Sequence, residues 1–193
     1  MLHPTYPLLT DRLSLRPFRD EDLDAFHAIQ SRPDVVRYLY WETQSRDGAR
    51  AMLQRRKLQV AIDDEGDGLH LAADLLASGA LAGHFSLQWS SKEHRQGEIE
   101  FVMHPDHHGH GYATEGAQLM LRLGFEELGL HRIVGRCDAR NTASGRLMER
   151  LGMRREAHLI ENEFVKGEWA DELVYAMLDR EWQTRSARQD TSA

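Results

Sequence analysis

The chain is poor in cysteine and has no long apolar run. Cys137 is the only cysteine among 193 residues. A single cysteine excludes an internal disulfide framework and a cysteine-based zinc site, and it is typical of proteins from a reducing compartment. No apolar run is long enough for a signal peptide or for a membrane span. We therefore expect a cytoplasmic protein.

Positive charge is also scarce. The formal net charge is -7, from 24 Lys and Arg against 31 Asp and Glu. This balance argues against nucleic acid or an anionic membrane as a partner, because both favour a basic surface. It does not exclude a small phosphorylated ligand that is bound locally. The length predicts one domain over residues 1–182, and the polar composition of residues 183–193 predicts a disordered tail.

Apolar periodicity and breaker residues predict a mixed α/β sheet. Residues 69–76 and 80–88 flank a turn at Ala77, Ser78 and Gly79, which is typical of a hairpin. Helical spacing follows Thr114, and Asn141 is a predicted helix cap. Further strands are predicted over residues 12–16, 98–103, 132–137 and 172–178, and a further helix over 45–60. Ligands of such sheets bind at the carboxyl ends of strands.

A short loop with two glycines joins the predicted strand that ends near His104 to the predicted helix from Thr114. The loop reads His108-Gly109-His110-Gly111-Tyr112-Ala113. Glycines let the backbone turn tightly, and the first turn of a helix leaves N–H groups without partners. The helix dipole adds partial positive charge at the same place, so this loop is a candidate pyrophosphate site that needs no lysine.

Four ordered segments together resemble the GNAT N-acetyltransferase superfamily, and within it the RimJ/RimL-like branch that acetylates N-termini of ribosomal proteins. The segments are residues 10–18, the loop with its extension 108–115, residues 125–133 and residues 141–153. The resemblance spans nearly the whole chain. It implies a GNAT fold, in which a mixed, mostly antiparallel sheet is flanked by helices and its middle strands diverge to hold acyl-CoA.

The resemblance also implies which residues bind the co-substrate, acetyl-CoA or another acyl-CoA, without a metal. The backbone of Val102, Met103 and His104 is expected to pair with the pantetheine arm. The pyrophosphate is expected on the loop, chiefly through its amides and the helix dipole. The expected contacts are with His108, Gly109, His110, Gly111, Tyr112, Ala113 and Thr114. Asn141 is expected to contact the pantetheine arm, and Arg146 either reaches a phosphate or is an ordinary exposed arginine.

The resemblance also implies which residues are catalytic, in the roles that acyl transfer requires. Glu98 and Glu100 share one strand face and are candidate general bases, acting directly or through a water, unless both simply face solvent. Ser144 matches a serine that donates a proton to the leaving thiolate, unless it is an ordinary helix serine. Tyr38 and Trp41 either wall the acceptor pocket or belong to the core. We expect direct attack in a ternary complex, without Cys137 as nucleophile.

The sequence leaves the acceptor, the acyl group and two other function classes open. A protein N-terminal α-amine is favoured because its pKa, about 8, is lower than that of lysine. A small-molecule amine is the alternative acceptor, and succinyl is an alternative to acetyl. Two other readings are a non-catalytic acyl-CoA-binding module and a metal-binding domain built on the histidine-rich stretch 104–110. The resemblance further implies a homodimer.

Overall fold

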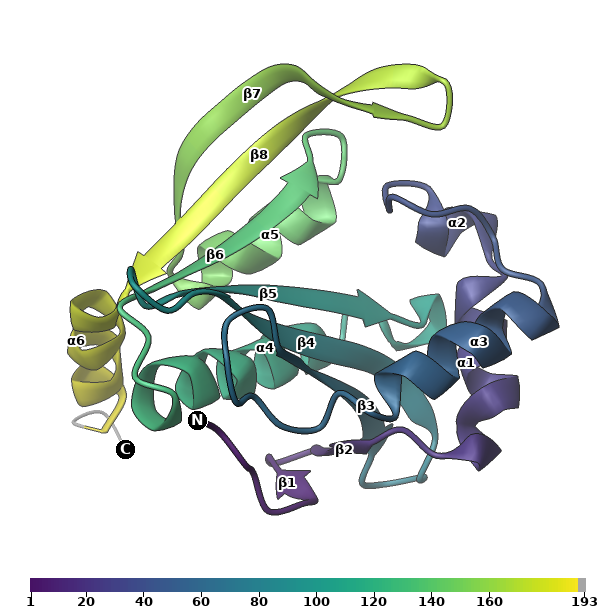
Figure 1. The fold of residues 1–193 in the computed structure, drawn as a ribbon, viewed down its shortest axis with the longest axis horizontal. Coiled ribbons are helices and arrows are strands. Elements are labelled where there is room, and N and C mark those ends of the chain that lie inside the picture. The colour runs from purple at the N-terminus through teal and green to yellow at the C-terminus, as the bar shows by residue number, and fades with distance from the viewer. Residues whose placement is uncertain (191–193) are drawn as a thin grey trace.

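Eight strands form one sheet in the computed structural model, which describes residues 1–190 (Figure 1). Their spatial order is β1-β2-β3-β4-β5-β6-β8-β7. The strands are β1 Leu8–Leu9, β2 Leu13–Pro17, β3 Gly68–Leu75, β4 Leu81–Ser91, β5 Gln96–Met103, β6 Arg132–Asp138, β7 Arg154–Val165 and β8 Glu168–Leu178. Neighbours are antiparallel except β5 and β6, which are parallel. The mixed, mostly antiparallel α/β sheet expected from the sequence is thus confirmed.

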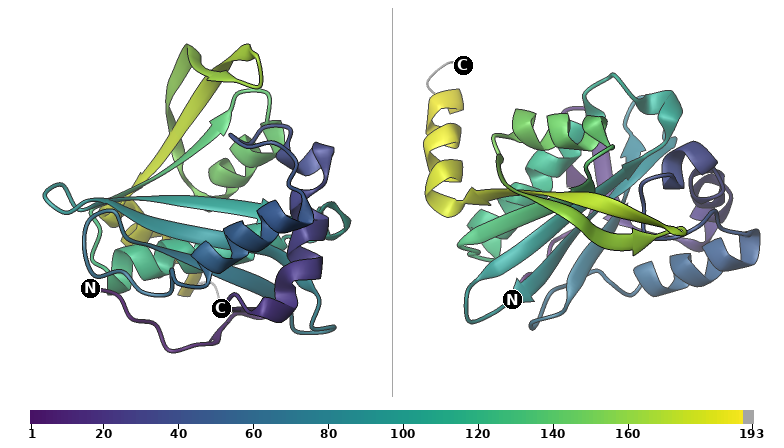
Figure 2. Two further views of the ribbon diagram at one scale, coloured as in Figure 1. Left: turned by 45° about the vertical axis from the view of Figure 1, so that its right-hand side comes forward. Right: turned by 90° about the horizontal axis from the view of Figure 1, so that it is seen from above.

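Helices cover both faces of this sheet. Helices α4 and α5 pack on one face, and α1 and α3 pack on the other (Figures 1 and 2). The helices are α1 Leu23–Gln30, α2 Pro33–Val36, α3 Arg46–Arg56, α4 Tyr112–Arg122, α5 Thr142–Leu151 and α6 Asp179–Asp190, with short turns η1 Asp20–Asp22 and η2 Pro105–His107 and a π-helical turn η3 Leu123–Glu127. Among the described residues, no helix combines the length and apolar character needed to cross a membrane.

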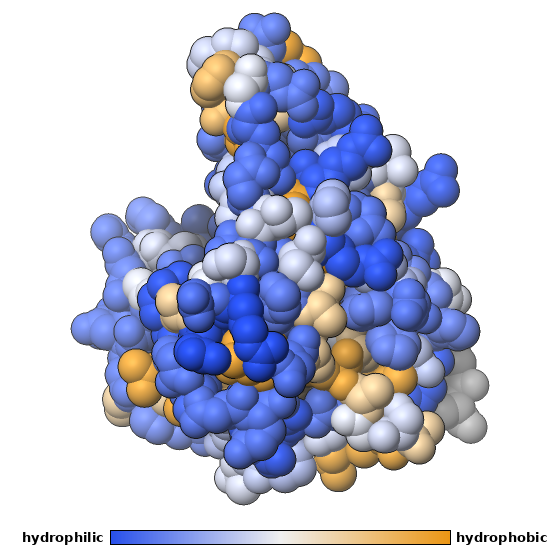
Figure 3. Space-filling model, turned by 90° about the vertical axis from the view of Figure 1, so that its right-hand side faces the viewer, coloured by the Kyte–Doolittle hydropathy of each residue, from blue (hydrophilic) through white to orange (hydrophobic). Residues whose placement is uncertain are grey.

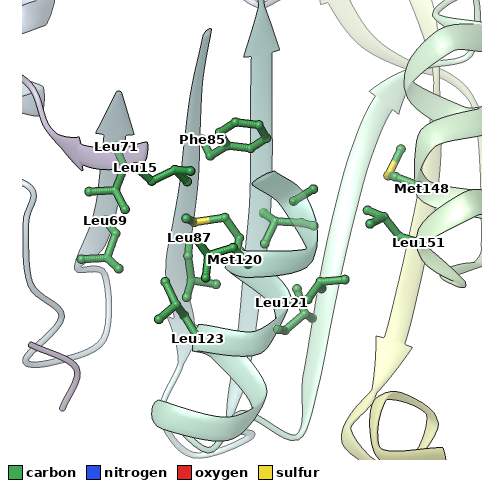
Figure 4. Close-up of a cluster of buried hydrophobic side chains, with 14 of the residues drawn as sticks. Leu15, Leu69, Leu71, Phe85, Leu87, Met120, Leu121, Leu123, Met148 and Leu151 are labelled. Atoms are coloured by element: carbon green, nitrogen blue, oxygen red, sulfur yellow. The ribbon is translucent and has the colours of Figure 1, made fainter. Parts of the chain in front are cut away.

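The main core lies between the sheet and α4 (Figure 4). Alternate side chains of β3 and β4 face this helix, because successive strand residues point to opposite faces. The buried side chains here include Leu69, Leu71, Phe85, Leu87, Met120, Leu121 and Leu123. Helix α4 approaches β4 closely because Gly116 has no side chain: a Cβ at this position would lie 2.2 Å from Cζ of Phe85. The position of α4 is therefore fixed by packing against β4.

The opposite face of the central strands is polar. His84 and Ser86 of β4 lie on it, and the register pairs Ser86 with Glu100 and Gln88 with Glu98 across β4 and β5. The two glutamates therefore share a face, as the sequence predicted. Helices α1 and α3 bury a smaller apolar cluster against β3, consisting of Phe18, Phe26, Ala49, Leu53 and Ala72.

Strands β5 and β6 separate part-way along their length. They pair only through three residue pairs, Gln96 with Arg132, Gly97 with Ile133 and Glu98 with Val134. Beyond these pairs each strand is bonded to its outer neighbour, β5 to β4 and β6 to β8. The diverging middle strands of the expected fold are therefore present, and their facing edges are not used by the sheet ladder.

The prediction of a disordered tail over residues 183–193 is wrong for residues 183–190, which lie in α6. The helix is anchored by Trp182, which stacks on Phe125 at 5.9 Å and donates a hydrogen bond to Glu126. Arg185 donates to the carbonyl of Arg150. The polar composition gave no sign of these anchors, because Trp182 is the one large apolar residue in the sequence of this segment. Residues 191–193 lie outside the described residues.

Several local predictions are confirmed. The hairpin joins β3 to β4, and Asn141 caps α5 through its Oδ1. The sequence did not predict β7, because this edge strand is largely exposed and lacks a clear apolar alternation.

Candidate active site

The glycine loop, residues 108–113, follows β5 and η2 and leads into the first residues of α4. Gly109 and Gly111 have φ values of +79° and +83°, in the left-handed region that favours glycine. Gly111 is the N-cap of α4. A Cβ on Gly109 would meet nothing within 4 Å, so its outer side is open. The loop thus has the backbone geometry that the sequence predicted.

Backbone donors of the loop are free. Within the described residues, the first hydrogen bond of α4 runs from the N–H of Glu115 to the carbonyl of Gly111, and the N–H groups of residues 109–114 donate to no protein acceptor. Together with the positive end of the α4 dipole, these groups suit a doubly charged phosphate group. His110 is exposed, and its ring lies 5.7 Å from the ring of Tyr112.

Two residues that the sequence reasoning did not single out hold this loop. Arg12, just before β2, donates from Nη1 to the carbonyl of His110 at 2.8 Å, and its guanidinium lies 4.8 Å from the ring centroid of Tyr112. Arg12 also forms an ion pair with Glu115 in the first turn of α4, at 2.7 Å. Arg12 and Glu115 lie 103 positions apart in the chain, so no local pattern could reveal the pair.

The histidine-rich stretch is tied to its own backbone. Nδ1 of His104 accepts from the N–H of Asp106, and Nε2 of His108 lies 3.4 Å from the carbonyl of Met103. Burial lowers the pKa of His107. Among the described residues, no three His, Cys, Asp or Glu side chains are grouped so as to hold a metal ion.

Of the three residues expected to pair with pantetheine, Val102 and Met103 end β5 and His104 directly follows it. Val102 and Met103 are buried on the ladder with β4. The N–H of His104 donates to the carbonyl of Ala82 at 2.8 Å, so this donor is already used. The edge of β5 that faces β6 remains for a ligand, as the fold expectation requires.

Glu98 stands at the last residue pair before β5 and β6 diverge. Its Oε2 lies 3.6 Å from Nε of Arg136, a residue of β6 that the sequence reasoning missed. Burial raises the pKa of Glu98, and the nearby guanidinium of Arg136 partly opposes this effect. Glu100 is exposed and accepts a hydrogen bond from Ser86 at 3.3 Å. A raised pKa in a half-buried carboxylate suits a general base better than a solvated carboxylate does.

Another carboxylate, this one buried, also pairs with Arg136. Glu172 of β8 is 3% exposed and accepts hydrogen bonds from Arg136, from Asn162 of β7 and from the hydroxyl of Tyr40. Arg136 therefore lies between Glu98 and Glu172. Burial raises the pKa of Tyr40, and the negative charge of Glu172 adds to this effect, so the phenol stays a donor. The Tyr40 contact links the segment after α2 to β8.

The start of α5 lies beside β6. Oδ1 of Asn141 accepts from the N–H of Ser144, which leaves the Nδ2 donors of Asn141 free within the described residues. Ser144 is half-buried. Burial raises the pKa of Cys137 to about 11, an effect that the nearby hydroxyl of Ser144 partly opposes. Cys137 is therefore a neutral thiol near pH 7. Arg146 is exposed and makes no hydrogen bond or ion pair with other described residues.

Tyr38 and Trp41, the residues expected to wall the acceptor pocket, have different surroundings in the structure. Trp41 donates to Gln30, which hydrogen-bonds to the buried His84, and so it belongs to an internal polar network. Tyr38 lies between the guanidinium groups of Arg37 and Arg140, at 5.2 Å and 5.9 Å from its ring. Tyr38 helps to line a recess between the segment after α2 and the β7–β8 hairpin.

This recess is predominantly acidic. Five carboxylates and three cationic side chains line it. They are Asp138, Glu163, Glu168, Asp171 and Glu172, and Arg37, Arg140 and Lys166. The surface on this side of the molecule is mainly hydrophilic, with apolar groups at the tip of the projecting hairpin (Figure 3).

Comparisons with known proteins agree with this geometry. The family described as acetyltransferase (GNAT) domain matches residues 12–154. The uncharacterized N-acetyltransferase YnaD of Bacillus subtilis (strain 168) is 33% identical over 91% of this chain and 98% of its own length. The spermidine N(1)-acetyltransferase of Escherichia coli (strain K12) is 24% identical over 88% of both chains.

A solved structure supports the same assignment. The crystal structure of a GNAT-family acetyltransferase from Bacillus anthracis superposes with a TM-score of 0.81, at 32% identity, over 90% of this chain and 99% of the other. The chain belongs to the GNAT family of N-acetyltransferases, which use acetyl-CoA. The family expected from the sequence is therefore confirmed.

Proposed function

We propose that the chain transfers the acetyl group of acetyl-CoA to a small cationic amine that binds on the polar face of the sheet, beside Glu98. The main support is the divergence of β5 and β6. Glu98 marks the point where the strands separate, and β5 leads from there to the glycine loop. A candidate base and a candidate phosphate site thus belong to one continuous segment.

Each step of the proposed acyl transfer is assigned to a different residue. Bound acetyl-CoA supplies the thioester that the amine attacks. Glu98 accepts the proton that the amine loses, directly or through a water, and its buried setting raises its pKa toward the working pH. Ser144 carries a hydroxyl proton beside β6 that can pass to the departing sulfur. Cys137, a neutral thiol, is not used as a nucleophile.

The co-substrate fits the residues around the loop. In the described part of the chain, the N–H groups of residues 109–114 and the side chain of Arg146 have no polar partner, so the loop and the α4 dipole can hold the pyrophosphate and Arg146 can reach a further phosphate. Asn141 offers its Nδ2 donors to the pantetheine arm. These assignments need no metal ion.

The acidic recess supports an acceptor with more than one positive charge. Its carboxylates outnumber its cations, and the buried Glu172 is linked to Glu98 through Arg136. A carboxylate-rich site attracts a polyamine and aligns its amines. The spermidine N(1)-acetyltransferase among the relatives acts on such a molecule, which gives independent support.

A protein N-terminal α-amine, the acceptor of the RimJ/RimL-like branch, is the second candidate. Its support is the projecting hairpin, where Phe164 and Trp169 form an exposed edge-to-face pair that could contact a peptide. An α-amine with a pKa near 8 also requires less deprotonation than lysine. Acetyl is the proposed acyl group and succinyl its competitor. A homodimer and a cytoplasmic location remain predictions.

A coupled assay of free CoA thiol decides between the acceptors. The purified protein is given acetyl-CoA or succinyl-CoA with spermidine, a diamine, a lysine derivative or peptides with different N-termini. We expect turnover with the polyamines and acetyl-CoA. Turnover restricted to peptides would select the second candidate, and CoA binding without turnover on any amine would indicate an acyl-CoA-binding module.

Variants test the proposed site in the same assay. Glu163→Gln removes a carboxylate from the recess and should raise KM for a polyamine, whereas Glu93→Gln, on the exposed β4–β5 turn, serves as the matched control. Glu98→Gln should lower kcat by roughly 100- to 10,000-fold. Full activity of Glu98→Gln would contradict the assignment of the base.

A further inference from the structure

Arg12 joins the N-terminal arm to the start of α4 through several contacts. Its Nε and Nη2 meet Oε2 of Glu115, each at 2.7 Å. Its Nη1 donates to the carbonyl of His110, and its guanidinium covers the ring of Tyr112. A Cβ on Gly111 would lie 3.3 Å from Nη2 of Arg12, so the guanidinium lies directly against the N-cap of α4. A planar guanidinium can satisfy such a carboxylate and a carbonyl at once.

Glu115 poses an electrostatic problem at this position. It lies in the first turn of α4, where the dipole and the free N–H groups should be available to a phosphate. Burial favours its neutral form, but hydrogen bonds from Thr10 and from the backbone and side chain of Arg12 outweigh burial and lower its pKa. Glu115 is therefore negatively charged near neutral pH, and an unpaired carboxylate here would repel a phosphate.

We propose that Arg12 is a positioning residue for CoA: it neutralises Glu115 at the start of α4 and holds the carbonyl of His110 so that the amides of the glycine loop face the pyrophosphate. This inference rests on the proposed function, because it assumes that the loop binds the pyrophosphate. The ion pair is half open to solvent on the Arg12 side, so its value lies in local charge and loop geometry more than in folding stability.

Charge and geometry make separable contributions. Arg12→Met leaves Glu115 unpaired beside the phosphate site and releases the His110 carbonyl, so CoA binding should weaken by roughly 5- to 30-fold. Glu115→Gln removes the repelling charge and frees the guanidinium, so CoA should bind as tightly as to the parent or more tightly. In the double variant the repulsion is absent, and much of the loss caused by Arg12→Met should be recovered.

The experiment measures the Kd of free CoA by calorimetry, together with Tm, for the full chain and these three variants. Arg122→Met is the matched control, because Arg122 forms a similarly exposed ion pair with Glu127 near the other end of α4. It should leave the Kd for CoA unchanged. Arg12→Lys is the second single variant should Arg12→Met fail to fold; it keeps the charge but not the planar fork, and its CoA affinity should fall between those of the parent and Arg12→Met.

Each outcome bears on a different part of the proposal. A lowered Tm with unchanged Kd in Arg12→Met, or the same loss of affinity in Arg122→Met, would overturn the positioning role. An Arg12→Met/Glu115→Gln double variant as weak as Arg12→Met would overturn the electrostatic argument. Failure of the parent to bind CoA, or undiminished binding by Gly111→Val, would instead refute the proposed use of the loop, and the inference with it.

Discussion

Replacing Gly116 with alanine is the sharpest test of how α4 is positioned. The added Cβ would lie 2.2, 2.5 and 2.7 Å from three ring carbons of Phe85, which is fully buried. Carbon atoms normally approach to about 3.5 to 4.0 Å, so α4 or the ring has to move by more than 1 Å. Figure 4 shows Phe85 on β4 directly beside this helix.

Two opposing terms set the expected change in unfolding free energy. Overpacking a dense core costs about 1 to 3 kcal/mol, and the severity of this contact places it at the upper end. Alanine in a helix gains about 1 kcal/mol over glycine. We therefore expect a net loss of about 2 kcal/mol, or roughly 4 to 8 °C in Tm for a chain of this size. Because α4 carries the glycine loop, the KM for acetyl-CoA should also rise.

Urea unfolding followed by tryptophan fluorescence measures this change. Gly48→Ala is the matched control, since Gly48 also lies inside a helix but the one close contact of its Cβ would be with the end of the flexible Gln44 side chain, at 2.7 Å. This variant should be neutral or slightly stabilising. A Gly116→Ala protein as stable as Gly48→Ala would refute the reasoning. Phe85→Leu should cost less in the Gly116→Ala background than alone, because the clash is then relieved.

Four further results are expected. Arg136→Met removes the cation that opposes the raised pKa of Glu98, so the acid limb of the pH profile of kcat/KM should move to higher pH; an unmoved limb would exclude Glu98 as the titrating base. His110→Ala should change the Kd of CoA by less than about threefold, since the proposed binding depends on the loop amides. Cys137→Ala should keep kcat within about threefold, and a trapped acyl group on the sulfur would contradict direct transfer. Desolvation lowers the pKa of the buried His84 and of the half-buried His70, the latter to about 4. Below pH 6.5 the unfolded chain therefore binds protons that the folded chain does not, and stability falls as pH drops. The free energy of unfolding should decrease between pH 6.5 and 5 by up to about 1.4 kcal/mol per pH unit for each histidine, and His84→Gln should remove one such contribution.

Local features of the site could be predicted from the sequence. The glycine loop, the Asn141 cap and the shared face of Glu98 and Glu100 depend on residues within a few positions of one another. Backbone sterics, capping and strand alternation determine such features, and they act over one or two turns of chain.

The remaining parts of the site depend on pairs that are distant in sequence. Arg136 meets Glu172 only after β6 and β8 pair, and Tyr40 reaches Glu172 from a segment 132 positions earlier. Trp41 illustrates the same limit: an aromatic beside a helix has no sequence signal that separates a pocket wall from a member of an internal network. The network with Gln30 became visible only from the packing of α1.

The distance between the base and the loop argues for an elongated co-substrate. Met103 lies five positions after Glu98 on β5, and a strand rises about 3.3 Å per residue, so the two ends of this stretch lie about 17 Å apart. A compact ligand cannot contact both ends. A molecule with phosphates at one end and its reactive group at the other can lie along the free edge of β5, with its phosphates on the loop and its acyl group near Glu98. The sheet ladder with β4 holds this stretch of β5 rigid, and Gly116 lets α4 pack closely on the same sheet. The glycine loop and the proposed base are therefore held at a fixed separation by the core itself, which is why a change as small as one methyl group at Gly116 should be felt in co-substrate binding as well as in stability.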